Sequence, residues 1–213
     1  MKADSVLTTR KTNASAKALL VATAGLLSDR GDLDVSFAEI SRRSGVNAAM
    51  IKYYFGNKDG LLLALVERDA ERPMAALEEL MDTPLSADEK LRLHIGGIIN
   101  TYYRCPYLNR LIHHLLDNAS SDAADHVIKI FIDPMVSAYQ AIIAQGVEEG
   151  CLISTDPRLL YFSLVGACEH IFFAARSVRH VLSPDGIEDD LKQRFAAHVT
   201  EILLSGLRPR PPM

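Results

Sequence analysis

The chain has 213 residues, of which 48% are hydrophobic and 23% charged, an ordinary composition for a soluble globular protein. Its net charge of −4 argues against non-specific nucleic-acid binding by the whole protein. The charge is unevenly distributed, because residues 1–58 have a net charge of +4 and residues 59–213 a net charge of −8. The three cysteines are widely spaced and form no CxxC pair, so neither a disulfide framework nor a zinc ribbon is indicated.

The hydrophobic periodicity is helical almost throughout, and no run alternates with the period of two that a strand requires. We therefore expect an all-α fold of about nine helices. The first helix ends at Gly31. The capping box Ser36-Phe37-Ala38-Glu39 opens a second, short helix from about Phe37 to Ser44. Asn47 is expected to cap a third helix that runs to about Phe55.

Prolines and capping residues divide the rest of the chain. The fourth helix begins at Lys58, and Pro73 is expected to kink or end it. A second capping box, Ser86-Ala87-Asp88-Glu89, opens the fifth helix, and Pro106 separates it from the sixth. A long seventh helix follows Ser120-Ser121-Asp122, and Pro134 is expected to kink it.

Gly150 closes the seventh helix, and Asp156-Pro157 is the N-cap and first residue of the eighth. Ser183-Pro184-Asp185-Gly186 separates the eighth helix from the ninth. We expect two domains, at residues 1–58 and 59–213, joined by the fourth helix.

The turn Ser44-Gly45-Val46-Asn47 joins the second and third helices, and its glycine supplies the left-handed backbone that a short turn needs. Three helices with such a turn near the N-terminus are typical of a helix-turn-helix. The third helix begins with small residues, which permit close approach to bases, and lysine pairs with guanine acceptors. The candidates for contacts with base edges are Asn47, Ala48, Ala49 and Lys52.

The segment Gly45–Leu61, with Tyr53-Tyr54-Phe55-Gly56-Asn57-Lys58-Asp59 at its centre, resembles the helix-turn-helix signature of TetR-type repressors. Ser36–Ser44 resembles the preceding helix of that family, and the match covers roughly residues 13–66. Many members have Tyr-x-His-Phe where this chain has Lys52-Tyr53-Tyr54-Phe55, so no relative's operator can be carried over.

The resemblance implies phosphate contacts from Ser36, from Tyr53 or Tyr54, and from Lys58, and both helix N-termini and cations favour phosphate oxygens. Ser36 acts as a helix cap in either case, and Tyr54 has a core position as its alternative. Two pairs of basic residues could also approach the DNA backbone. Arg10 and Lys11 precede the first helix. Arg42 and Arg43 are adjacent in the second helix, and their alternative is a solvated helix face.

The segment Leu159–Ala175 is apolar around most of its helix, so it must be buried on more than one side. By position, it and the amphipathic ninth helix resemble the pair that forms the family's four-helix dimer interface. The alternative is that both helices complete the core of one chain. The interface candidates are Leu160, Leu164, Ala167, Ile171, Leu191, Phe195, Val199 and Ile202.

The fifth to eighth helices carry many polar aromatic residues and histidines for interior positions. Glu169 and His170 lie in the apolar eighth helix, and because a buried charge needs a partner, they either pair internally or meet a ligand. An apolar pocket with a few polar groups suits a small-molecule effector. The effector-pocket candidates are His94, Tyr102, Tyr103, His113, Asn118, Tyr139, Glu169, His170 and Phe173.

These features together indicate a ligand-responsive transcriptional regulator. Residues 1–58 are expected to form its helix-turn-helix DNA-binding domain, and residues 59–213 its effector-binding and dimerisation helical bundle. We expect a repressor that binds a pseudo-palindromic operator in double-stranded DNA as a homodimer and that a small-molecule effector of unknown identity releases. We expect no catalytic residue, cofactor or metal. We also expect a cytoplasmic protein, because the N-terminus lacks the apolar core of a signal peptide and Leu159–Ala175 is short for a membrane span, which needs roughly 20 residues.

Two other classes remain as alternatives. A helical metalloenzyme would use His94, His113, His114, Glu169 or His170, but adjacent histidines point roughly 100° apart on a helix and no HExxH motif is present. A helix-turn-helix used only for protein binding would not need the positive N-terminal charge or the chemistry of Tyr53 and Lys58.

Overall fold

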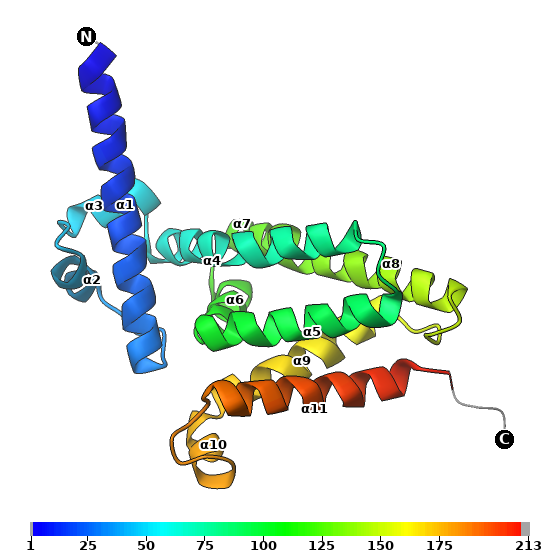
Figure 1. Cartoon of the computed structure of the whole chain (residues 1–213). Helices are drawn as coiled ribbons and strands as arrows, with labels where there is room; N and C mark the ends of the chain where they lie inside the picture. Colours follow the sequence, from blue (N-terminus) through cyan, green and yellow to red (C-terminus); the bar gives the residue numbers. More distant parts are fainter. Residues whose placement is uncertain (1, 210–213) are drawn as a thin grey trace. The chain divides into compact units, whose positions relative to one another are not determined.

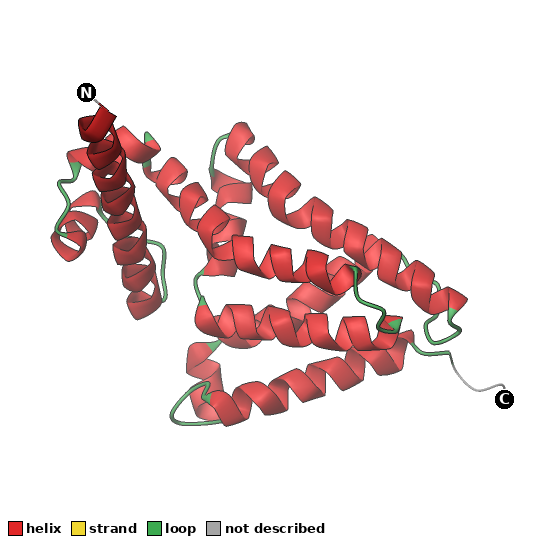
Figure 2. Ribbon diagram, turned by 45° about the horizontal axis from the view of Figure 1, so that its top comes forward, coloured by secondary structure: helices red, strands yellow, loops and turns green. Residues whose placement is uncertain are grey.

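The computed structural model describes the backbone of residues 2–209 and the side chains from residue 14 to residue 209. These residues form helices and loops without a strand, which confirms the all-α prediction (Figure 2). They fold as two compact units. The first unit comprises Met1–Asp69 and Tyr107–Val127, and the second comprises Ala70–Pro106 and Ile128–Met213.

The first unit is built around α1, which packs against α2 and α3 (Figure 1). Leu19, Leu27, Ile40 and Ile51 are fully buried, so one apolar face of each of these three helices forms the core. α6 packs against α7 in the same unit. The helices are α1 (Lys2–Arg30), α2 (Phe37–Ser44), α3 (Ala49–Phe55), the first part of α4 (Lys58–Met81), α6 (Leu108–Asn118) and α7 (Ser121–Val127).

The second unit has α5 at its centre, packed against α8, α9 and α11. Leu91, Ile95 and Ile99 are buried at helical spacing along α5, which explains why this helix can be covered on several sides. The elements are the last part of α4, α5 (Ala87–Arg104), η1 (Ile128–Ile132), α8 (Asp133–Glu148), α9 (Pro157–Phe173), α10 (Ala175–Val181) and α11 (Asp189–Leu207).

The caps predicted at Ser36, Asn57, Ser86 and Asp156 are confirmed, whereas the N-cap of α3 is Ala48 and not the predicted Asn47. Ser36 and Ser86 each form a complete capping box with the glutamate three residues later. The Asp156 carboxylate accepts a 2.9 Å hydrogen bond from the backbone N–H of Arg158 at the start of α9. The Asn57 side chain accepts a 2.8 Å hydrogen bond from Gly60 N–H at the start of α4. Local side-chain chemistry therefore sets these helix boundaries.

The described residues form eleven α-helices and one π-helical turn, against about nine predicted helices. The predicted seventh helix is divided into α7, η1 and α8, with Pro134 in the first turn of α8. Because proline cannot donate to the carbonyl four residues earlier and its ring crowds that carbonyl, the wider π-helical turn before it is a physical consequence. α4, in contrast, does not end at Pro73 but continues to Met81.

The predicted eighth helix is also divided. α9 ends at Phe173, and α10 leaves it at an angle of 77° after Ala174. Neither glycine nor proline marks this bend, so the sequence carries no local signal for it. The single helix predicted up to Ser183 is therefore wrong, while the break at Ser183–Gly186 before α11 is confirmed.

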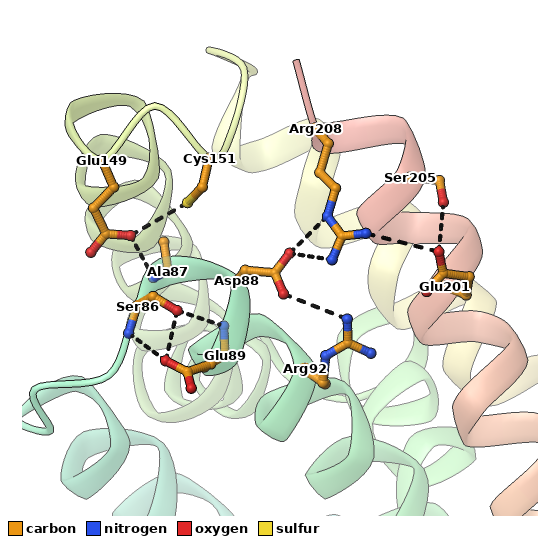
Figure 3. Close-up of polar contacts among 10 residues, drawn as sticks. All are labelled: Ser86, Ala87, Asp88, Glu89, Arg92, Glu149, Cys151, Glu201, Ser205 and Arg208. Atoms are coloured by element: carbon orange, nitrogen blue, oxygen red, sulfur yellow. Dashed lines mark hydrogen bonds and ion pairs between the residues drawn. The ribbon is translucent and has the colours of Figure 1, made fainter. Parts of the chain in front are cut away.

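Side-chain contacts tie the N-terminus of α5 to two other helices of the second unit (Figure 3). Asp88 accepts hydrogen bonds of 3.0 and 2.7 Å from the Arg208 guanidinium beyond the end of α11. Glu149, after α8, accepts a 2.9 Å hydrogen bond from the backbone N–H of Ala87. Acidic groups at a helix N-terminus are favoured by its partial positive charge, so these contacts stabilise this end of the unit.

Length and composition alone would let one helical stretch of the described residues, Ser121–Glu148, cross a membrane. The bent pair formed by α9 and α10 passes the same test as one span. The core helices of soluble proteins share these properties, so they do not by themselves assign a membrane span.

Gly60 is required for the junction between α3 and α4. A Cβ atom at this position would overlap the backbone carbonyl oxygen of Phe55, which cannot rotate away. We expect Gly60→Ala to lower the free energy of unfolding by about 1–3 kcal/mol through this overlap. Urea denaturation followed by far-UV circular dichroism measures the change.

Gly97 provides the matched control. It is exposed in the interior of α5, and a Cβ atom there meets nothing within 4 Å. Gly97→Ala should raise the free energy of unfolding by about 1 kcal/mol, because alanine has the higher helix propensity. A Gly60→Ala variant as stable as Gly97→Ala would contradict the geometry of the α3–α4 junction.

Candidate functional site

Hydrogen bonds fix the turn between α2 and α3. Gly45 has a φ of 70°, and its N–H donates to the Ser41 carbonyl oxygen over 2.9 Å. The Ser41 hydroxyl donates to the Val46 carbonyl over 2.7 Å, and Val46 N–H donates to the Ser44 hydroxyl over 3.1 Å. With its polar groups bound on both sides of the glycine, this turn holds α3 in one direction relative to α2.

One side of α3 is anchored and the other is open. Ile51 is fully buried, and the Asn47 side chain accepts a 2.9 Å hydrogen bond from the N–H of Ala49. Ala49, Lys52 and Tyr53 are exposed and lie three and four residues apart, so they share one helical face. We call these three residues the recognition face. Tyr53 is its largest member and is 72% exposed.

The other predicted DNA-binding residues lie around the recognition face on the same unit. Asn47 is exposed in the turn, and Ala48 is half-buried at the start of α3. Tyr54 is half-buried, with its ring 5.0 Å from that of Tyr53 and 6.1 Å from that of Phe55, so it shares in the packing of α3. Lys58 is half-buried as the first residue of α4. Their contacts with DNA stay predictions.

The Ser36 hydroxyl is already engaged in the cap of α2. It accepts a 3.3 Å hydrogen bond from Glu39 N–H and donates to a Glu39 carboxylate oxygen over 2.7 Å. Glu39 also forms an ion pair with Arg30 at the end of α1. Ser36 is exposed, so any approach of a phosphate here would compete with a carboxylate that Arg30 neutralises in part.

The four other basic residues divide into two groups. Arg43 forms an ion pair with Asp29 of α1 and lies across Gly25, where a Cβ atom would come 2.6 Å from its guanidinium. It therefore holds α2 against α1, a long-range contact that sequence reasoning missed. Arg42 is exposed. Arg10 and Lys11 lie within α1 and not before it, and their side chains are outside the described residues.

Three effector-pocket candidates come together inside the second unit. His94 of α5 and Tyr139 of α8 are buried, and the His94 Nε2 atom lies 2.9 Å from the Tyr139 hydroxyl. Tyr102 of α5 is 3% exposed, and its ring centroid lies 6.3 Å from that of Phe172 on α9. Tyr161, Cys168 and Phe172 of α9, which the sequence analysis left out of the pocket, are buried here as well.

The electrostatics of this cluster keep its groups uncharged. Burial lowers the pKa of His94 to about 4. Burial, and then the charge of Glu169, raise the pKa of Tyr102 well above its ordinary value and that of the Cys168 thiol to about 12. Imidazole, phenol and thiol are therefore all neutral near pH 7.

Glu169 is half-buried on α9, and its charge acts on this cluster. The other remaining candidates are placed elsewhere. Tyr103 lies under Lys192 of α11, whose Nζ atom is 4.4 Å from the ring centroid, so its ring packs against α11. His113 and Asn118 are exposed on α6 of the first unit. His170 is exposed on α9, and Phe173 is 37% exposed at its end.

Most of the predicted dimer-interface side chains lie in the core of the protomer. Because α9 is apolar around its circumference, periodicity could not tell the inward face from the outward one. The buried members are Leu160, Leu164, Ile171, Leu191 and Val199; Ala167 and Phe195 are half-buried, and Ile202 is 59% exposed. These five buried residues are therefore corrected to core positions.

A different face of α9 is available to a partner. Leu159 is 64% exposed and Phe162 72% exposed, and Gly166 and Phe173 continue this face at helical spacing. We call these four residues the outer face of α9.

Among the residues whose side chains are described, no three His, Cys, Asp or Glu groups gather where they could hold a metal ion.

Two family models match the chain. One, described as "Bacterial regulatory proteins, tetR family", covers residues 19–65, and the other, "Tetracyclin repressor-like, C-terminal domain", covers residues 84–210. The HTH-type transcriptional regulator RutR of Escherichia coli strain K12 is 26% identical over 208 residues, which is 94% of each chain.

Solved structures share the fold. A transcriptional regulator FadR from Bacillus subtilis in complex with stearoyl-CoA has a TM-score of 0.69 and 19% identity, over 89% of this chain and 98% of that one. AibR in complex with isovaleryl coenzyme A and operator DNA has a TM-score of 0.69 and 20% identity, again over 89% and 98%.

Glu39 makes the stability of the first unit depend on pH. Hydrogen bonds from Arg30, and then from Ser36, lower its pKa from 4.5 to about 2. A carboxyl group with a depressed pKa in the folded state stabilises the fold above its unfolded pKa, and that contribution is lost as pH falls through the folded value. We therefore expect the loss between about pH 4.5 and about pH 2.

The variant Glu39→Gln tests this effect, since glutamine can still cap α2 but carries no charge. Its thermal midpoint should be lower than that of the wild type near pH 7, and the two should converge as the pH falls toward 2. Differential scanning calorimetry across this range provides the measurement. A constant difference at every pH would exclude the ion pair as the cause.

Proposed function

Because the chain belongs to the TetR family of bacterial regulatory proteins, we propose that it is a ligand-responsive repressor that binds a pseudo-palindromic operator as a homodimer. Members of this family are DNA-binding transcription regulators and not enzymes. The observation that carries the proposal is the recognition face: Ala49, Lys52 and Tyr53 lie together on the open side of a short helix whose other side is anchored.

In this proposal α3 enters the major groove. Ala49 is small enough for a base edge to come close, and Lys52 can donate to the acceptors of guanine. Asn47 and Ala48 lie at the start of the same helix and would complete the contacts with bases. Ser36, Tyr53, Tyr54 and Lys58 would contact phosphate oxygens and fix the protein on the duplex. Residues 1–58 would then be the DNA-binding domain and residues 59–213 the effector and dimerisation domain.

We assign the dimer contact to the outer face of α9 and to Ile202 of α11, which is 59% exposed. Large apolar side chains at 64% and 72% exposure, Leu159 and Phe162, are costly in water and gain free energy when a second copy covers them. Binding of such a dimer to a pseudo-palindrome requires its two α3 helices to lie in major grooves roughly 34 Å apart or a multiple of it.

The effector would bind in the second unit and act by a shift of population. FadR and AibR were each solved in complex with a coenzyme A thioester, which supports a small-molecule ligand for this fold. A tenfold loss of operator affinity needs a difference of about 1.4 kcal/mol in ligand binding between the two states. The whole regulator would act in the cytoplasm, where the chromosome of a bacterium lies.

Operator binding is tested with DNA selected from a random-sequence pool and titrated by fluorescence anisotropy at several salt concentrations. Lys52→Ala should cost about 1–3 kcal/mol and relax the preference at one base pair. Lys58→Ala should weaken binding to all sequences alike and reduce the salt slope by about 1. Lys129→Ala, an exposed lysine of η1 in the second unit, should leave both unchanged.

The regulator proposal depends on that selection. Enrichment of a pseudo-palindrome, with nanomolar binding that Lys52→Ala impairs, supports it. If no sequence is enriched by apo protein that has been refolded free of small molecules, the proposal is overturned.

The dimer is tested with Phe162→Glu, which places a charge at the centre of the outer face of α9. We expect a change from dimer to monomer in light scattering coupled to gel filtration, because a buried unpaired charge opposes association. Val147→Glu, at a 46% exposed position of α8, is the control and should stay dimeric. A Phe162→Glu protein that remains a dimer at micromolar concentration would place the interface elsewhere.

A further inference from the structure

Most of the surface of α10 is open. Val178 is the buried residue among its seven, and the other six are exposed. The helix leaves α9 at an angle of 77°, and Figure 1 shows it at the end of α9, before the loop that leads to α11. So short a helix is marginal alone, and one buried side chain adds little packing. α10 is therefore an arm whose sides are free to meet another molecule.

Large apolar side chains are exposed before the arm and at its end. Phe173, the last residue of the outer face of α9, is 37% exposed. Val181 is 72% exposed, and Leu182 after it is 54% exposed. Apolar side chains gathered on a surface mark sites of association. A second copy that covers the outer face of α9 as far as Phe173 comes close to α10, which begins two residues later.

One side of α10 is basic. Arg176, Arg179 and His180 are exposed and lie three and four residues apart, so they share a face of the helix that points away from Val178. We call these three residues the basic face. Among the described residues, neither arginine has an ion-pair partner. Arginine is enriched in protein–protein contacts, and its guanidinium can pair with a carboxylate through two parallel hydrogen bonds.

An acidic segment follows the arm, in the loop before α11 and in its first turn. Asp189 pairs with Lys192 over 2.7 Å, and Asp190 pairs with Arg194 over 3.5 Å. The other two carboxylates have no ion-pair partner among the described residues, and no ion pair there joins the segment to the basic face. The acidic segment consists of four exposed residues, Asp185, Glu188, Asp189 and Asp190.

Two-fold symmetry makes such a surface self-complementary. In a two-fold dimer, if one residue contacts a second residue of the partner, the same pair forms again with the two copies exchanged. A basic patch beside an acidic patch can therefore pair twice, whereas two basic faces brought together would repel each other. Charge complementarity thus favours a second copy of this chain as the partner of α10, with the arm of each copy on the acidic segment of the other.

We propose that α10 is a docking arm for a second copy of this chain. Its basic face pairs with the acidic segment of the partner subunit, and the same contact covers Val181 and Leu182. This inference rests on the proposed function, because it takes the dimer as the state in which the arm is used. It adds to the apolar contact of α9 an electrostatic part that fixes the register of the two copies.

Charge reversal on the arm tests the contact. In the double variant Arg176→Glu/Arg179→Glu the arm would meet the acidic segment with a like charge. Because each arginine occurs twice in a dimer, we expect the dissociation constant to rise about tenfold or more at about 0.05 M salt. The rise should be smaller at about 0.5 M salt, since counter-ions screen exposed pairs. Sedimentation equilibrium of the full-length chain measures both values.

The reciprocal double variant Asp185→Lys/Glu188→Lys should weaken the dimer to a similar extent. Glu188 is the N-cap of α11 but makes no capping hydrogen bond through its side chain, so its replacement removes no cap. The variant with all four substitutions should regain most of the wild-type affinity, because the pairs form again with their signs exchanged. Misfolding of either double variant cannot produce this recovery.

The double variant Arg72→Glu/Lys129→Glu is the matched control. It makes the same change of charge at exposed positions of α4 and η1 in the second unit, and it should leave the dissociation constant unchanged. Equal affinity of the wild type and both reversal variants would overturn the proposal, as would further weakening in the variant with four substitutions.

The wild type and Phe162→Glu separate this proposal from that of the dimer itself. If the wild type is a dimer that Phe162→Glu dissociates while the reversal variants stay as tight, the outer face of α9 remains the interface and the docking arm is excluded. If the wild type is a monomer at micromolar concentration, the proposed dimer fails and the docking arm fails with it.

Discussion

The direction of the recognition face depends on the polar contacts that hold α2 at both ends. At its N-terminus Glu39 caps the helix and pairs with Arg30, and toward its C-terminus Arg43 pairs with Asp29. Both pairs join α2 to α1. A seven-residue helix such as α3 is too short to be stable alone. Its direction therefore depends on α1 and α2, to which the Gly45 turn connects it. Both ion pairs are partly exposed, so each contributes little to the free energy of folding, and their main effect is to orient α2 on α1.

The features predicted correctly from the sequence depend on contacts between residues that are close together in the chain. The helix starts at Ser36, Ser86 and Asp156 were correct because a side chain caps a backbone N–H two or three residues away. The contact of Arg43 with Asp29 was missed, because it joins residues on different helices. The 77° bend after Ala174 was missed for a related reason, since packing and not a proline or glycine produces it.

The candidate sites divide in the same way. The recognition face follows from a motif in which burial of Ile51 fixes what is exposed on the opposite side. On α9 almost every residue is apolar, so periodicity could not separate Leu160 in the core from Leu159 on the surface. The meeting of Tyr102 with Phe172, seventy positions further along, could not be read from spacing either. Sites built within one short motif were thus predictable, and sites assembled by packing of distant helices were not.

In the proposed mechanism, a ligand in the second unit has to act on the first, and the chain itself joins the two compact units. It crosses three times, after Asp69, after Pro106 and after Val127. Pro73 within α4 lies near the first crossing and the π-helical turn η1 at the third, and Pro106 lies in the loop between α5 and α6 at the second. Proline removes a donor and a π-helical turn replaces the regular bond pattern, so these are the positions where helices bend at least cost. In the proposed mechanism, an effector bound in the second unit alters DNA affinity only by binding one arrangement better than another, and the covalent connections between the two units run through those three points.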